Sequence, residues 1–298
     1  MKVLNFGSLN IDYVYRVDHI LVKGETESSF SRNIFAGGKG LNQSVALGRA
    51  GVNVYHAGCI GEDGRFMVEL LNEAGVDTRF VKVLTDSPSG HTVIQNDKEG
   101  DNCILLYGGA NIRVTKEQVD ETLKEFDAGD YLVLQNEISE LPYIIEKAHE
   151  KGMVIVLNPA PMNENIQRLE LSYVDYFILN EIEAAQLTAR SSDITRQPDE
   201  EELVNALRKE FPSAKTVLTL GVAGSVYIDD KETIRQGIYE VKPVDTTAAG
   251  DTFTGYFLAG MTEGKPVKEA LDMAAKASSI TVTRPGAAPS IPLRSELR

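Results

Sequence analysis

The sequence has few of the features that build disulfide-rich, membrane-spanning or zinc-centred proteins. Its 298 residues include only two cysteines, Cys59 and Cys103, which favours a reduced cytosol over a disulfide framework. No run approaches the roughly 20 apolar residues that a membrane-spanning helix needs, and the first residues show no apolar signal-peptide core. The four histidines are scattered without the spacing of zinc ligands. We therefore expect a cytoplasmic protein with no membrane partner.

Positive charge is also scarce. Thirty lysines and arginines stand against 44 aspartates and glutamates, which gives a formal net charge of −14. A surface of this kind repels nucleic acid, so we expect small-molecule partners and no nucleic acid. A nucleotide ligand remains compatible with the charge, because backbone N–H groups at a helix start bind anions whatever the net charge.

A Walker A phosphate-binding loop is missing as well. After Gly38 and Lys39 the sequence has Gly40, where that motif requires serine or threonine, and no other segment fits. Any nucleotide site must therefore be built in another way.

Strand-like and helix-like segments alternate through most of the chain. We expect strands at 3–6, 53–60, 131–134, 153–157, 176–179 and 216–220, and helices at 38–50, 66–74, 139–151, 198–209, 251–261 and 267–280. Regular β-α-β alternation predicts an α/β fold with a doubly wound, mostly parallel sheet. We expect a single domain over residues 1–298.

Four segments break this alternation. Residues 11–18, 28–34, 91–96 and 102–107 alternate in side-chain character with period two, and no helix separates the members of either pair. They predict a small antiparallel β sheet, discontinuous in sequence, from approximately 11–35 and 90–108. Periodicity alone fits an extension of the main sheet as well as a lid over a cleft.

Polar or glycine-rich clusters follow five of the expected strands. They comprise residues 7–12, 135–137, 158–161, 180–183 and 219–221. Ligands of open α/β sheets bind beyond the carboxyl ends of the strands, so these clusters predict one polar cleft.

Two segments could carry chemistry at that cleft. At 248–250, Ala-Ala-Gly precedes an apolar helix whose N-terminal N–H groups would favour an anion. Asp251 stands at the same point, where a carboxylate can accept a hydroxyl proton as that oxygen attacks a γ-phosphate. The glycine-rich segment 37–42 opens another helix, with Lys39 and Asn42 as hydrogen-bond donors. Taken singly, Gly-Asp before a helix is more often a helix cap, and segment 37–42 is equally a glycine-rich helix start.

Taken together, the motifs resemble the ribokinase-like family of carbohydrate and nucleoside kinases. The resemblance runs from Gly7 to Ser290 and includes segments 7–12, 37–43, 109–111, 158–161, 180–183, 245–253 and 283–290. It implies an ATP-dependent sugar kinase with Mg²⁺ and an activating monovalent cation, usually K⁺. The implied reaction converts D-ribose and ATP to ribose 5-phosphate and ADP. The small sheet matches the family's lid, which also forms the contact of a homodimer.

The resemblance also implies roles for individual residues. Asp251 matches the catalytic base, and the anion hole is matched by Ala248, Ala249 and Gly250. Sugar-binding positions are matched by Asn10, Asp12, Gly38, Lys39, Asn42, Glu137 and Asp251, and nucleotide-binding positions by Asn180, Thr219, Gly221 and Gly250. Glu183 and Asn180 match the pair of residues that organises Mg²⁺ and phosphate through water. The loops for the monovalent cation are matched by Asp245, Thr247, Thr281, Arg284 through its backbone carbonyl, Gly286 and Ser290.

The sequence departs from the usual pattern near the expected sugar. His91 and Thr92 stand where small apolar residues are common, and Asn136 stands where leucine is common. These differences keep other acceptors open, namely deoxyribose, fructose, another pentose, a keto-deoxy sugar acid or a nucleoside. A further alternative is a non-catalytic sugar or nucleotide sensor, against which the retained Asp251, Gly250 and Lys39 argue.

Overall fold

The structure is a computed structural model, and it describes residues 1–188 and 199–297. Its main sheet has the strand order β13-β12-β11-β10-β9-β8-β1-β4-β5. The strands are β1 (Val3–Phe6), β4 (Val54–Gly61), β5 (Asp77–Leu84), β8 (Tyr131–Gln135), β9 (Val154–Asn158), β10 (Tyr176–Asn180), β11 (Lys215–Thr219), β12 (Ser225–Ile228) and β13 (Thr233–Gln236). All neighbours from β11 to β5 are parallel, and β12 and β13 add an antiparallel edge.

Helices cover both faces of this sheet. One face packs against α1 (Lys39–Arg49), α2 (Arg65–Glu73), α7 (Ala249–Thr262) and α8 (Val267–Thr281). The other packs against α3 (Lys116–Leu123), α4 (Leu141–Glu150), α5 (Glu181–Leu187) and α6 (Glu200–Glu210). Successive strand residues serve opposite cores, since Val3 joins the first and Leu4 the second. This explains why the central strands are continuously apolar, and it confirms the predicted doubly wound α/β fold.

Most expected elements are present, with ends shifted by one to three residues. The helix expected from residue 198 begins at Glu200, because the side chain of Asp199 accepts a hydrogen bond from the N–H of Glu201. Pro198 lies outside the described residues. Elements β5, α3, α5, β12 and β13 were not predicted, because they are short or carry mixed side chains without a clear period.

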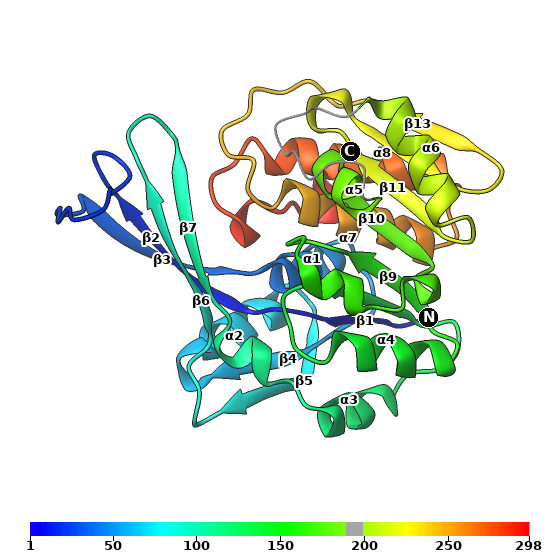
Figure 1. The fold of residues 1–298 in the computed structure, drawn as a ribbon, viewed down its shortest axis with the longest axis horizontal. Helices are drawn as coiled ribbons and strands as arrows, with labels where there is room; N and C mark the ends of the chain where they lie inside the picture. The colour runs from blue at the N-terminus through cyan, green and yellow to red at the C-terminus, as the bar shows by residue number, and fades with distance from the viewer. Residues whose placement is uncertain (189–198, 298) are drawn as a thin grey trace.

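The four period-two segments form a separate sheet rather than an extension of the main one. It comprises β2 (Asn10–Arg16), β3 (Ser31–Gly37), β6 (Gly90–Asn96) and β7 (Asn102–Tyr107), in the order β3-β2-β6-β7. Figure 1 shows these strands extending away from the body of the molecule, at the left. We call this element the small sheet.

The expectation that the small sheet is purely antiparallel is wrong for its central pair. The pairs β2–β3 and β6–β7 are antiparallel, whereas β2 and β6 run parallel. The reason is the chain path: β2 follows the end of β1 and β6 follows the end of β5, so both leave the carboxyl edge of the main sheet in the same direction.

Two glycines on helices let α1 lie close to its neighbours. A Cβ atom at Gly40 would stand 2.4 Å from the backbone nitrogen of Ser8, and one at Gly255 would stand 2.4 Å from the Cβ of Ala46. Gly40 therefore allows α1 to cross the end of β1, and Gly255 allows α7 to approach α1. These contacts bring the starts of both helices to the same edge of the sheet. None of the described helices has the length and apolar character to cross a membrane.

Candidate active site

Asp251, the predicted base, lies in the first turn of α7 and is only 8% exposed. Two side chains of α1 hold its carboxylate. Asn42 Nδ2 donates to Oδ2 at 3.0 Å, and Gln43 Nε2 donates to Oδ1 at 3.0 Å. The carboxylate therefore bridges α7 to α1, and it is not an ordinary N-terminal cap, which would bond its own helix. The Oδ1 atom of Asn42 is buried without a partner among the described residues.

The start of α7 has the geometry of an anion site. Ala248 takes a left-handed conformation with φ 61°, which turns the chain sharply into the helix. The N–H of Ala249 bonds to Thr246 O and that of Thr252 to Ala248 O. Across the described residues no acceptor engages the N–H groups of Gly250 and Asp251, as expected for a helix N-terminus. They border a cavity of about 240 Å³ that Lys39, Asn180 and Glu183 also line.

Three carboxylates act electrostatically on the ammonium group of Lys39. Burial alone would lower the pKa of Lys39, but the negative charges of Asp251, Glu137 and Glu183 outweigh burial and raise it. The cation is therefore held firmly in its charged form. Burial raises the pKa of both Glu137 and Glu183, and Lys39 opposes this rise in each.

Asn180 and Glu183 form a reciprocal cap at the start of α5. Asn180 Oδ1 accepts from the N–H of Glu183 at 2.8 Å, and Glu183 Oε2 accepts from the N–H of Asn180 at 3.0 Å. This cap leaves Glu183 Oε1 without a role in the helix, on a side chain that lines the 240 Å³ cavity. A carboxylate oxygen beside a small polar cavity fits a hydrated Mg²⁺ ion.

The predicted sugar-binding residues gather where the small sheet joins the body. Asn10 is buried, and its Oδ1 accepts from Asn111 Nδ2 at 2.7 Å. Asp12 Oδ1 accepts from Thr92 Oγ1 at 2.6 Å, and burial raises the pKa of Asp12 although this hydrogen bond opposes the rise. A Cβ atom at Gly38 would stand 3.1 Å from the backbone nitrogen of Asn10, so Gly38 lies beside that strand.

Glu137 is joined to the same group by the start of α1. Its Oε2 accepts from the hydroxyl of Ser8 and, at 3.1 Å, from the N–H of Lys39. Ser8 Oγ in turn accepts from the N–H of Gly40 at 3.2 Å. Glu137 therefore fixes the glycine-rich start of α1 against the end of β1. The 240 Å³ cavity is not lined by Asn10, Asp12, Gly38, Asn42 or Glu137.

The residues that depart from the family pattern lie in three different settings. Thr92 faces the same side of the small sheet as Asp12, with which it is in register. His91 faces the opposite side, where its ring centroid is 5.9 Å from that of Tyr13 and 5.0 Å from that of Tyr107. Asn136 Nδ2 donates to Pro161 O and Asn163 Oδ1, so it joins two loops. Only Thr92 touches a predicted sugar-binding residue.

A second, larger cavity continues from the start of α7. It measures about 820 Å³ and is lined by Thr219 and Gly221 together with apolar side chains such as Val222, Ile238 and Phe253. Gly221 has φ +53°, which favours glycine there. Asn180, Thr219, Ala249 and Gly250 line both cavities, so the two cavities adjoin. An apolar cleft ending at a helix N-terminus suits a base and its phosphates.

The predicted cation loops meet through Asp245. Its Oδ1 accepts from the N–H and hydroxyl of Thr247, and its Oδ2 accepts from the N–H of Gly286 at 2.9 Å. Burial would raise the pKa of Asp245, but these hydrogen bonds outweigh burial and lower it. Arg284 N–H bonds to Thr281 O, whereas Ser290 Oγ bonds to Ala287 O. The structure thus joins Asp245, Thr247 and Gly286 directly, and no described contact ties Ser290 to them.

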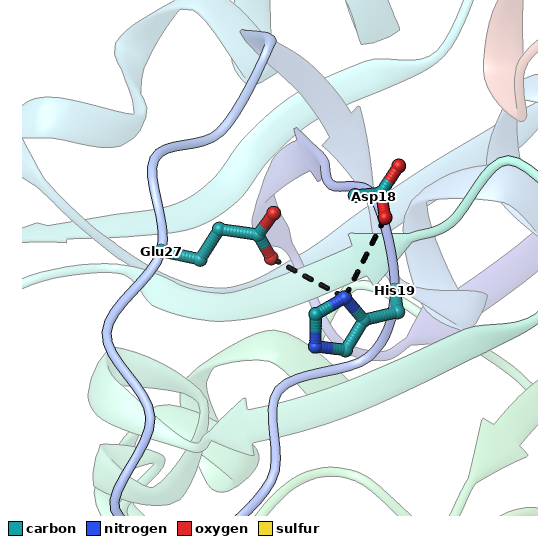
Figure 2. Close-up of side chains that lie close together, drawn as sticks. All are labelled: Asp18, His19 and Glu27. Atoms are coloured by element: carbon teal, nitrogen blue, oxygen red, sulfur yellow. Dashed lines mark ion pairs between the residues drawn. The ribbon is translucent and has the colours of Figure 1, made fainter.

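One cluster of potential metal ligands lies away from this cleft. Within the described parts of the chain, Asp18, His19 and Glu27 are the one such group, and Figure 2 shows both carboxylates directed at His19. His19 Nε2 also lies 2.8 Å from Glu25 Oε1, and this hydrogen bond raises the pKa of His19. A protonated imidazole accounts for the surrounding carboxylates. The cluster lies in the exposed loop between β2 and β3, so we interpret it as an ion-pair cluster.

Comparison with known proteins agrees with this geometry. Residues 1–294 match the family described as pfkB family carbohydrate kinase. The chain belongs to this family. Ribokinase from Haemophilus influenzae is 35% identical to the kinase over 298 residues, which cover 97% of this chain and 95% of the relative.

Solved structures give the same result for the fold of the kinase. Ribokinase from Cryptococcus neoformans var. grubii in complex with ADP is 32% identical, with a TM-score of 0.87 and coverage of 99% and 98% of the two chains. Arabidopsis thaliana ribokinase complexed with ribose and ATP is 29% identical, with a TM-score of 0.86 and coverage of 99% and 96%. These similarities confirm the predicted resemblance, the fold and an ATP-dependent carbohydrate kinase.

Three contact residues of the kinase site were not predicted. Gln43 binds Asp251, Ser8 binds Glu137 and Asn111 binds Asn10. Each lies inside a motif segment, which was the available signal. Their contacts span about 100 residues or more in sequence, and such long-range pairing cannot be inferred from local pattern.

Proposed function

We propose that this kinase transfers the γ-phosphoryl group of ATP to the 5-hydroxyl of D-ribose, giving ribose 5-phosphate and ADP. The observation that carries the proposal is the position of Asp251. Its carboxylate is held by Asn42 on one side and borders the cavity at the start of α7 on the other. The base therefore lies between a polar group suited to sugar hydroxyls and a space suited to phosphates.

The roles of the residues follow from this arrangement. Asp251 would accept the proton of the sugar hydroxyl as its oxygen attacks the γ-phosphorus, while the bond to the β-phosphate oxygen breaks. The N–H groups of Gly250 and Asp251 and the ammonium of Lys39 would stabilise the negative charge of the transferring group. The unpaired Oδ1 of Asn42 is an acceptor ready for a sugar hydroxyl. Asn10, Asp12 and Glu137 supply further acceptors for the sugar.

Metal ions complete the proposed site. Glu183, through water, would hold Mg²⁺, which when bound neutralises charge on the phosphates. The loops of Asp245, Thr247, Thr281, Arg284, Gly286 and Ser290 would hold K⁺ through oxygen atoms. This proposal is supported by Asp245, which ties the first loop to Gly286 of the second. The kinase would act in the cytoplasm, where ATP is available.

The choice of acceptor is tested by ADP release with ATP and Mg²⁺ against ribose, 2-deoxyribose, fructose, a keto-deoxy sugar acid and adenosine, each with Na⁺ or K⁺. We expect ribose to be preferred and K⁺ to stimulate turnover. Preference for another acceptor would contradict ribose as the substrate but not the kinase activity. Equal rates in Na⁺ and K⁺ would contradict the proposed K⁺ site.

Thr92 is expected to tune sugar recognition through Asp12. Thr92→Val keeps the shape of the side chain but removes its hydrogen bond to Asp12 Oδ1. A hydrogen bond to a charged group stabilises its two partners by about 1.5–3 kcal/mol. We expect part of this energy to be missing from ribose binding in the variant, so KM for ribose should rise about tenfold. The value of kcat should change little, since phosphoryl transfer is untouched.

Steady-state kinetics on ribose check this, with Thr122→Val as the control. Thr122 is also buried, and its hydroxyl bonds to Gln118 O on α3, outside the site. An unchanged KM in Thr92→Val, or the same change in both variants, would remove Thr92 from sugar recognition.

We also propose that the kinase is a homodimer through its small sheet. The sheet exposes several large apolar side chains, including Ile104 at 56%, Leu105 at 70% and Tyr107 at 51%. Apolar surface of this extent is typical of a protein interface. We expect sedimentation equilibrium to give a dimer for the unaltered chain and a monomer for Leu105→Asp. A monomeric unaltered chain would contradict the assignment.

A further inference from the structure

We infer that Gln43 is a positioning residue for the base Asp251, and that a buried series of amides ending at Gly40 O fixes its direction. This inference rests on the proposed function. Gln43 is fully buried and donates from Nε2 to Asp251 Oδ1 at 3.0 Å. The same nitrogen lies 3.3 Å from Asn158 Oδ1, so both amide hydrogens have acceptors.

The amide of Gln43 has one possible orientation. Its Oε1 accepts from Gln135 Nε2 at 2.7 Å, at the end of the neighbouring strand β8. A flipped amide would turn Oε1 towards the carboxylate of Asp251 and would set two donors against each other at Gln135. The flipped form therefore loses three hydrogen bonds, to Asp251, Asn158 and Gln135, and gains a repulsion.

A backbone carbonyl ultimately sets this orientation. Asn5 Nδ2 donates to Gly40 O at 2.8 Å and to Ser44 Oγ at 2.8 Å. A carbonyl oxygen only accepts, so Asn5 must present its Oδ1 to Gln135, which donates from Nε2 at 3.0 Å. Gln135 then donates to Gln43 from the same nitrogen. Gly40 O therefore fixes the orientation of the Asn5 amide, and Asn5 fixes that of Gln135. Gln135 in turn fixes the amide of Gln43, which donates to Asp251.

The series leaves one polar atom without a partner. Both hydrogens of Gln135 Nε2 are used, on Asn5 and Gln43. Its Oε1 is buried and has no donor among the described residues. Buried acceptors are normally satisfied. The missing hydrogen bond falls on Gln135, the residue that orients Gln43. Such a cost is expected where the orientation of a functional side chain is maintained.

The two donors on Asp251 have different uses. Asn42 has a buried, unpaired oxygen, which we assign to the sugar, whereas every polar atom of Gln43 is bonded within the protein. Gln43 therefore acts through Asp251 and not on the substrate. Its hydrogen bond keeps the carboxylate from rotating away from the position in which it accepts the proton.

The test compares Gln43→Leu with the unaltered kinase in its pH dependence. We expect kcat to fall about 100-fold, as for a slightly misplaced catalytic group, with KM for sugar and ATP changed less than about threefold. Loss of a donor to the carboxylate should also move the acid limb of the kcat profile upward by about one pH unit. Gln43→Glu, which keeps the size, should move it further, because two adjacent carboxyl groups share a proton.

Gln118→Leu is the matched control. Gln118 is also buried, and its Nε2 donates to Gly58 O at 3.0 Å, away from Asp251. We expect this variant to lose thermal stability as Gln43→Leu does, while its kcat and acid limb stay at the values of the unaltered kinase. The inference fails if Gln43→Leu and Gln118→Leu behave alike.

A second readout does not need turnover. Carbon-13 NMR of labelled aspartate records the carboxylate signal of Asp251, and Asp251→Asn assigns that signal. We expect the Asp251 signal to shift in Gln43→Leu and to stay in place in Gln118→Leu, and equal signals in the two variants would overturn the inference. Absence of turnover with every acceptor in the unaltered kinase would instead overturn the proposed function alone.

Discussion

Asp251→Asn is expected to lower kcat about 10³-fold or more, with little change in sugar affinity. The amide cannot accept the hydroxyl proton, so the step that generates the attacking oxygen loses its base. The side chain keeps its size and its place between Asn42 and Gln43, although one of its two contacts becomes donor against donor. The main effect therefore falls on the reaction and not on the fold. Steady-state kinetics with ribose measure it.

Binding measurements separate this result from misfolding. Ribose and ATP should still raise the unfolding temperature of Asp251→Asn, because ligands that bind the native state stabilise it. Asp120→Asn provides the control, since Asp120 lies on α3 and bonds only to the half-buried Tyr143 in the hydrogen bonds described. Near-normal turnover in Asp251→Asn would remove Asp251 as the base.

Lys39→Met is expected to lower kcat/KM for ribose about 10²-fold or more. The ammonium is the cation shared by Asp251, Glu137 and Glu183, and it faces the cavity proposed for the phosphates. Its loss removes charge stabilisation of the transferring group, for which single donors contribute on this scale. Lys39→Met also removes the positive charge that favours the ionised form of Glu137 and Glu183. The acid limb of the kcat/KM profile should therefore move to higher pH.

The same change should alter the pH dependence of stability. Burial already raises the pKa of Glu137 and Glu183 above the ordinary value, so the folded state binds more protons than the unfolded state and loses stability as pH rises. Without the positive charge of Lys39, the pKa values of Glu137 and Glu183 should rise further. The folded protein should then lose more stability as the pH rises. Thermal unfolding at pH 5.5 and pH 8 checks this, with Lys147→Met as control, since Lys147 lies on α4 and is only half-buried. Parallel curves for the two variants would contradict the assigned role of Lys39.

The sequence predicted the parts of the fold and site that depend on local pattern. The buried strands of the main sheet are short apolar runs, and the start of α1 carries glycines that close approach explains. The clusters at the strand ends were expected to meet, and Asn158, Asn180 and Thr219 do line one cavity. In these cases a residue type and its neighbours were sufficient.

The remaining features depend on contacts between distant segments. The parallel pairing of β2 with β6 follows from where both strands leave the main sheet, which no periodicity records. His91 and Thr92 are adjacent in sequence, yet strand alternation directs only Thr92 to Asp12. Gln43 resembles any polar helix residue until α7 brings Asp251 against it. Registers and interhelical contacts decide these features.

The most direct test of the account is identification of the product formed from ATP, Mg²⁺, K⁺ and ribose by ³¹P NMR, with Asp251→Asn run in parallel. We predict one sugar phosphate, ribose 5-phosphate, formed in equal amount with ADP by the unaltered kinase and almost absent with the variant. A phosphate on another hydroxyl, or ADP formed equally by both proteins, would contradict the central claim that Asp251 activates the 5-hydroxyl of ribose.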